Sequence, residues 1–116
     1  MTDTIPGDLH GLNTVDKHQM DRRAGAYEYS ITASGGGNVH LKIEHYTGDQ
    51  PGTDIDSIKG HWKTIEERAK VESGHTMTGS FTLPETLDSN GYGRMRVKLS
   101  RGIGTKGVDY KFVMNP

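Results

Sequence analysis

Two stretches near the C-terminal end alternate between apolar and polar residues, and they constrain the fold more than any other feature. They are Tyr92–Ser100, YGRMRVKLS, and Val108–Met114, VDYKFVM. A period of two is typical of a β-strand that has one face on a core and the other in water. The linker between them, RGIGTKG, supplies the glycines that hairpin loops use, so we expect the two strands to form a hairpin.

The same pattern predicts strands earlier in the chain. Gly25–Ala33 and Val39–His45 alternate on either side of the turn sequence SGGG, which indicates a second hairpin. A further strand, His75–Leu83, is stopped by Pro84. With one ambiguous segment this makes six candidate strands joined by short glycine-rich turns. We therefore expect an all-β fold, an antiparallel β-sandwich or jelly-roll-like domain spanning residues 25–116.

The ambiguous segment is Ile58–Ser73. As a helix, it would place Ile58, Trp62 and Ile65 on one face, and its charged residues have high helix propensity. As a strand, it would lead through Ser73-Gly74 directly into the next alternating run. We favour a strand for the second half, and a short helix within 58–70 is the alternative.

Residues 1–24 are polar and show no sustained period, and Pro6, Gly7 and Gly11 oppose a helix. We expect an extended N-terminal arm that lies on its own sandwich or on a neighbouring subunit. Its apolar residues are candidate partner contacts: Ile5, Leu9 and Leu12. Hydrophobic residues make up only 31 % of the chain, and it contains 16 glycines. This predicts a thin core, partly covered by other subunits of a homo-oligomer.

Arg94, Arg96 and Lys98 form a cationic stripe on one face of their strand. Three interpretations are open: a solvated face flanked by acidic residues on neighbouring strands, a contact with another subunit, or a polyanion-binding surface. The formal net charge of −1 argues against a dedicated nucleic-acid binder.

The aromatic residues Trp62, Tyr46 and Tyr92 are candidate glycan contacts, because solvent-facing rings on a β-sandwich can stack on sugars. A single tryptophan is also typical of a core or interface anchor. The alternative function that these residues suggest is a carbohydrate-binding module.

No metal, cofactor or catalytic site is predicted. The loop carrying Asp49, Asp54 and Asp56 could hold Ca²⁺, but its spacing does not fit an EF-hand and ordinary turn chemistry explains the aspartates. The six histidines form no HExxH-like pair, and the chain has no cysteine. No nucleophile elbow or phosphate-binding loop occurs, so we expect no enzyme. No apolar run reaches the ~20 residues of a membrane-spanning helix, and the N-terminus has no apolar signal-peptide region.

The segments GSFTLP (79–84), GYGRMRVKLS (91–100) and VDYKFVMNP (108–116) resemble small β-sandwich accessory proteins of tailed-bacteriophage virions. They also resemble carbohydrate-binding-module sandwiches. The first resemblance implies a non-enzymatic structural protein, a capsid decoration, cement or tail-associated protein that binds other virion proteins, often as a homo-oligomer. It would be made in the host cytoplasm and located in the virion.

Overall fold

The computed structural model describes residues 2–47, 62–85 and 91–116, and in these ranges the regular structure is all β. The strands are β1 (Asp3–Leu9), β2 (Val15–Arg23), β3 (Gly25–Ser34), β4 (Asn38–Tyr46), β5 (Trp62–Glu72), β6 (Thr76–Leu83), β7 (Tyr92–Arg101) and β8 (Val108–Asn115). Within the described residues, no helix has the length and apolar character needed to cross a membrane.

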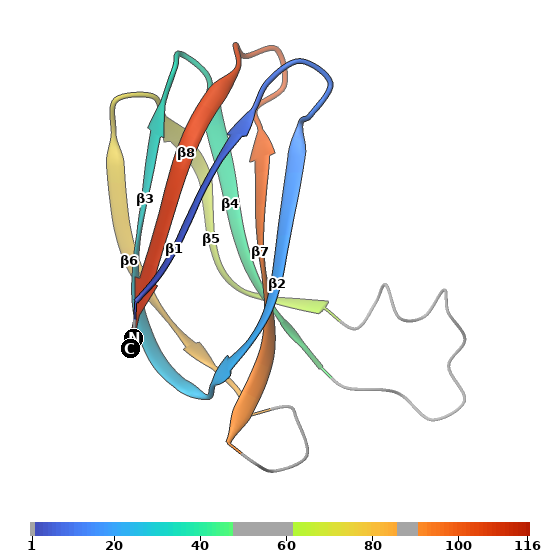
Figure 1. The fold of residues 1–116 in the computed structure, drawn as a ribbon, viewed down its shortest axis with the longest axis vertical. Helices are drawn as coiled ribbons and strands as arrows, with labels where there is room; N and C mark the ends of the chain where they lie inside the picture. The colour runs from blue at the N-terminus through green and yellow to red at the C-terminus, as the bar shows by residue number, and fades with distance from the viewer. Residues whose placement is uncertain (1, 48–61, 86–90) are drawn as a thin grey trace, which may run out of the picture.

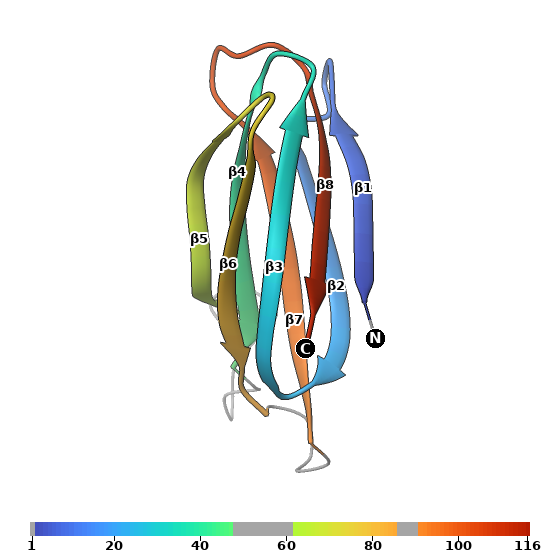
Figure 2. The ribbon, with the colours of Figure 1, turned by 90° about the vertical axis from the view of Figure 1, so that its left-hand side faces the viewer.

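The strands form two antiparallel four-stranded sheets that pack face to face (Figures 1 and 2). Sheet A has the order β1-β8-β3-β6, and sheet B has the order β2-β7-β4-β5. Most successive strands lie in opposite sheets, and each sheet interleaves early strands with late ones. This is the topology of a jelly roll, which confirms the predicted fold class.

The core lies between the sheets and comes from the inward residues of the alternating runs. Tyr27, Tyr29, Ile31 and Ala33 of β3 face the inward residues of β4 and β7. The fully buried large side chains are Phe112, Leu9, Ile31, Leu41, Ile43, Leu83, Met95, Leu99, Met114, Val39, Val71 and Val97. The low apolar content is thus concentrated at inward positions, and it forms one continuous core.

The predicted N-terminal arm, lying on its own sandwich or on a neighbouring subunit, is instead part of the sandwich in the described residues. Residues 3–9 pair with β8 from Asp3↔Met114 to Leu9↔Val108, and residues 15–23 pair with β7. The boundary placed after residue 24 therefore does not separate an arm from the sandwich. Leu9 is fully buried and Ile5 packs against the core, so both side chains stabilise their own sandwich.

Both predicted hairpins are also wrong, although their strands are present. β3 and β4 lie in different sheets, as do β7 and β8. The two connecting loops cross between the sheets and lie side by side, with the Gly37 N–H donating to the Gly107 carbonyl. Glycines permit a crossover between sheets as readily as a hairpin turn, so composition alone could not decide the pairing.

Residues 62–72 form strand β5, so the helix alternative is wrong for the described part of 58–70. The 11 residues of β5 pair with the nine residues of β4, and the register shifts twice along the pair. The two extra residues are therefore in β5, as β-bulges. Bulges interrupt the alternation of buried and exposed residues, which explains why the local pattern looked helical.

A tyrosine bridges the two sheets at the β1/β2 side of the sandwich. The ring of Tyr110, on β8, lies where a side chain at Gly7 of β1 would be. Its hydroxyl donates to Asp16 Oδ2 at 2.6 Å and lies 2.9 Å from His18 Nε2, both on β2. Burial and the neighbouring Asp16 carboxylate raise the pKa of Tyr110.

The β5/β6 side repeats this arrangement with different residues. The ring of Tyr29 lies over Gly79 of β6, and a Cβ at Gly79 would be 2.6 Å from its Oη. The Tyr29 hydroxyl donates to Glu66 Oε2 at 2.7 Å and accepts from Arg68 Nε at 3.0 Å. Arg68 also donates to the Thr78 carbonyl of β6, so its side chain links the edges of the two sheets.

Candidate interaction surfaces

The outer face of sheet B carries most of the side chains that the sequence marked as functional. The register across β2, β7 and β4 places Arg94 beside Asp21 and Arg96 beside Gln19 and Glu44. In the next row Lys98 lies between Lys17 and Lys42. The cationic stripe therefore exists as predicted, on the second strand of a four-stranded sheet.

The two arginines of the stripe are paired with acids on neighbouring strands, as in the solvated-face interpretation. Arg94 Nε donates to Asp21 Oδ1 at 2.9 Å, and this hydrogen bond is the main cause that lowers the pKa of Asp21. Arg96 Nε donates to Glu44 Oε1, also at 2.9 Å, and the Glu44 side chain is only 10 % exposed. These contacts hold the guanidinium groups in place on the outer face of the sheet.

The aromatic residues Tyr46 and Trp62 are direct cross-strand neighbours beside these arginines. Their ring centroids lie 5.6 Å apart in an edge-to-face arrangement. The Arg96 guanidinium lies 4.4 Å from the Trp62 ring centroid, and that of Arg94 lies 6.0 Å from the Tyr46 centroid. We call Tyr46, Trp62, Arg94 and Arg96 the aromatic–arginine patch. The ion pairs hold the cations over or near the rings, so the patch is preorganised.

Lys98 differs from the two arginines because its cross-strand neighbours are lysines. Lys17, Lys98 and Lys42 lie in one row across β2, β7 and β4, and we call them the lysine row. Within the described residues, none of the three forms an ion pair. Glu67 lies opposite Lys42, but its carboxylate bonds to His40. Sequence reasoning missed Lys17 and Lys42 because only the register brings them beside Lys98.

The other predicted contact residues lie elsewhere. Leu12 is fully exposed in the turn between β1 and β2, whereas Leu9 and Ile5 point into the sandwich. Tyr92 is 39 % exposed, and the Arg23 guanidinium lies 5.3 Å from its ring centroid. It lines a cleft of about 530 Å³ at the end of the sandwich rather than joining the aromatic–arginine patch.

The loop with Asp49, Asp54 and Asp56, and also His61, lies outside the described residues. Among the residues that are described, no group of three or more histidine, aspartate or glutamate side chains is arranged to hold a metal ion.

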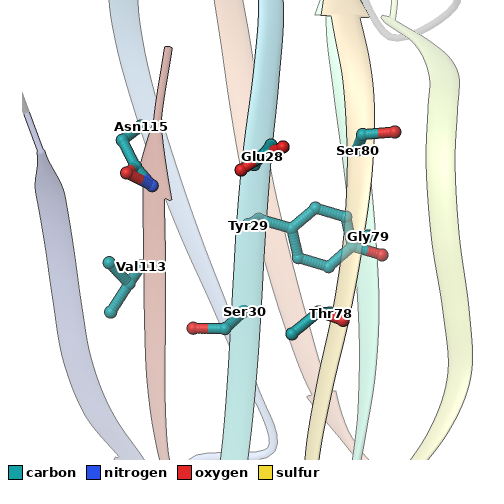
Figure 3. A pocket seen from close by; sticks show the side chains of 8 residues that line it. All are labelled: Glu28, Tyr29, Ser30, Thr78, Gly79, Ser80, Val113 and Asn115. Carbon is teal, nitrogen blue, oxygen red and sulfur yellow. The ribbon is translucent and has the colours of Figure 1, made fainter.

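A groove of about 450 Å³ lies on the outer face of sheet A, over β8, β3 and β6 (Figure 3). Glu28, Ser30, Thr78 and Ser80 line it, together with Val113 and Asn115. These are mostly short hydroxyl side chains with one carboxylate, and the lining contains no histidine, lysine or cysteine. The groove therefore lacks the paired acid and base that hydrolytic chemistry uses.

No protein family model matches this chain, and no curated protein matches it. Several solved structures resemble its fold at low sequence identity. The periplasmic g-type lysozyme inhibitor PliG of Aeromonas hydrophila matches with a TM-score of 0.53 and 13 % identity, over 98 % of this chain and 84 % of that one. The Yersinia pseudotuberculosis-derived mitogen matches with a TM-score of 0.54 and 10 % identity, over 99 % and 85 %.

Structures of infectious bursal disease virus also resemble the fold. For the Gx strain the TM-score is 0.46 and the identity 10 %, over 98 % of this chain and 30 % of the viral one. Fold and surface together define the class of protein: a jelly-roll sandwich, eight-stranded over residues 2–47, 62–85 and 91–116, whose sheet B carries a charged and aromatic outer face. At these identities the resemblances concern the fold alone, and jelly rolls serve many functions.

Proposed function

We propose that this chain is a non-enzymatic binding protein that docks onto a larger protein assembly through the outer face of sheet B. The observation that carries the proposal is the aromatic–arginine patch. Tryptophan, tyrosine and arginine are the residue types that dominate protein–protein hot spots. Here they lie side by side on a rigid sheet, and Trp62 is half-buried by its neighbours.

The geometry of the patch supports docking in two ways. Its side chains are held by the Arg96–Glu44 and Arg94–Asp21 pairs, so little rotamer freedom would be lost on binding. Three of its residues also lie on strands paired on both sides, Tyr46 on β4 and Arg94 and Arg96 on β7, whereas Trp62 lies on the edge strand β5. We propose a virion as the assembly, because segments 79–84, 91–100 and 108–116 resemble phage accessory proteins, with the chain acting as a decoration, cement or tail-associated protein.

The test is native light scattering and co-purification from the source cells, comparing wild type with Trp62→Ala. We expect the wild type to recover a defined assembly protein and Trp62→Ala to lose it. Thr78→Ala, on the outer face of sheet A, is the matched control and should retain the partner. A wild-type protein that behaves as a monomer and recovers no assembly protein would overturn the proposal.

The second candidate is carbohydrate binding, favoured by the contact between Tyr46 and Trp62 on an exposed sheet face. Trp62 is the only tryptophan in the chain, so its fluorescence reports directly on this patch. A saturable change in emission on titration with a neutral oligosaccharide, abolished by Tyr46→Ala, would support this function. Unchanged emission across a glycan panel would count against it.

A further inference from the structure

We infer that the lysine row is a binding site for an anionic, sulfated glycan. The inference goes beyond assembly docking and does not depend on it, because the anion site rests on Lys17, Lys98 and Lys42. Only the sugar contact beside the row involves Tyr46 and Trp62 of the aromatic–arginine patch.

The first argument is the local imbalance of charge. Lysines directly opposite one another on neighbouring strands have Cβ atoms about 5 Å apart, and like charges in such positions destabilise a sheet. Lys98 has a lysine on both sides, and Lys98 and Lys42 are half-buried along their strands. The row does not stabilise the sheet, whereas an anion bound across the three ammonium groups would relieve their repulsion.

The second argument is the charge on the three strands that carry the row. The outward residues of β2, β7 and β4 include six cations, which are Lys17, Arg23, Lys42, Arg94, Arg96 and Lys98, against the two carboxylates Asp21 and Glu44. On the edge strand β5, Glu67 lies opposite Lys42 and Glu72 opposite Asn38, and these carboxylates bond to His40 and Lys70. The sequence has a formal net charge of −1, so positive charge is concentrated on β2, β7 and β4. Such an asymmetry raises the local concentration of anionic ligands.

The third argument concerns which cations are available. The planar guanidinium group of arginine recognises carboxylates and phosphates through paired hydrogen bonds. The guanidinium groups of Arg94 and Arg96, however, already bind Asp21 and Glu44. What remains is a row of ammonium groups, which act as point charges and bind compact anionic groups, a sulfate ester among them. The carboxylates that flank the row limit it to a short anionic segment and disfavour a nucleic-acid backbone, which is bound by broad basic fields.

Two aromatic rings beside the lysine row could contact the sugar part of such a ligand. Tyr46 lies on β4, four residues from Lys42 and on the same face, with Trp62 beside it. An extended saccharide could therefore place sulfates on the lysine row and a sugar ring near the aromatic pair.

The test is isothermal titration of the full chain with a heparin-derived octasaccharide in 50 mM and 200 mM NaCl. Wild type should bind, and higher salt should weaken binding because exposed charges are screened. The variant Lys42→Gln/Lys98→Gln should bind at least tenfold more weakly. Lys106→Gln/Lys111→Gln removes the same charge away from the row, and it should stay within twofold of wild type.

Thermal unfolding of the row variant provides a separate readout. Lys42→Gln/Lys98→Gln should be no less stable than wild type, because the substitutions remove a like-charge contact, so weaker binding cannot be attributed to unfolding.

Equal binding of the octasaccharide by the two double variants, or no binding by wild type, overturns the site. Equally tight binding of a single-stranded oligothymidylate or of poly-L-glutamate keeps an anion site but overturns the glycan assignment. The two proposals can fail separately. A variant that loses octasaccharide binding but still recovers the assembly protein, or one that loses the assembly protein but still binds the octasaccharide, shows that the lysine row and the docking surface act independently.

Discussion

Replacement of Leu9 by alanine tests directly whether the N-terminal residues are part of the sandwich. Leu9 is fully buried and pairs with Val108 at the end of β1. Leu→Ala in a core costs about 2–5 kcal/mol, and because β1 is an edge strand that can relax, we expect about 3 kcal/mol. With a urea m-value of roughly 1–3 kcal/mol/M, the unfolding midpoint should fall by about 1–3 M. Urea titration followed by circular dichroism measures this shift.

Leu12 provides a matched control, since it is the same residue type three positions away and is fully exposed. Leu12→Ala should change the free energy of unfolding by no more than about 0.5 kcal/mol. If residues 1–24 were an arm detached from the sandwich, both substitutions would leave the monomer's stability unchanged. Equal midpoints for Leu9→Ala and wild type would therefore refute the assignment of β1.

Three further predictions concern Gly79, Tyr110 and His45. Gly79→Ala should destabilise the fold by roughly 1–3 kcal/mol, because the new Cβ meets the Tyr29 ring, and a thermal melt will show it. Tyr110→Phe removes the donor to Oδ2 of the part-buried Asp16 carboxylate, whose Oδ1 still accepts from Asn13, and should cost about 1–3 kcal/mol at neutral pH. Folding raises the pKa of Tyr110, so the stability that its neutral hydroxyl contributes is lost as the pH rises above about 10, the pKa of tyrosine in the unfolded chain. Above that pH, the denaturant midpoint of Tyr110→Phe should therefore fall less steeply with pH than the midpoint of wild type. Burial lowers the pKa of His45, so the free energy of unfolding of wild type should decrease as the pH falls below about 6.5. An equal decrease in the His45→Gln variant over that pH range would contradict this.

The strands that the sequence predicted are those whose inward positions are consistently apolar. β7 and β8 place Met95, Val97, Phe112 and Met114 in the core, so alternation was sufficient to find them. β2 could not be found in this way. Its inward positions hold Asp16, His18, Met20 and Arg22, whose polar groups bond to Tyr110 and Asp3 at the open side of the sandwich.

The pairing of the strands was beyond the reach of local patterns. Alternation says which residues face inward but not which strand lies alongside, and β1 pairs with a strand about a hundred residues away. The candidate site shows the same limit. Arg94, Arg96 and Lys98 could be placed on one face from the sequence, and Trp62 and Tyr46 could be named as candidate contacts, but their adjacency comes from the structure. The acids that neutralise the arginines, and the lysines that flank Lys98, emerged only from the register.

The position of β8 has a consequence for biosynthesis. The ribosome releases β1, β3 and β6 before β8, yet β8 is the strand that joins β1 to β3 in sheet A. Until it emerges, β1 has no hydrogen-bonding neighbour in its sheet, and the apolar faces of β3 and β6 lack the Phe112 and Met114 side chains. Sheet A therefore cannot be completed before β8 has been synthesised, and until then the exposed apolar faces of β3 and β6 make the nascent chain prone to aggregation.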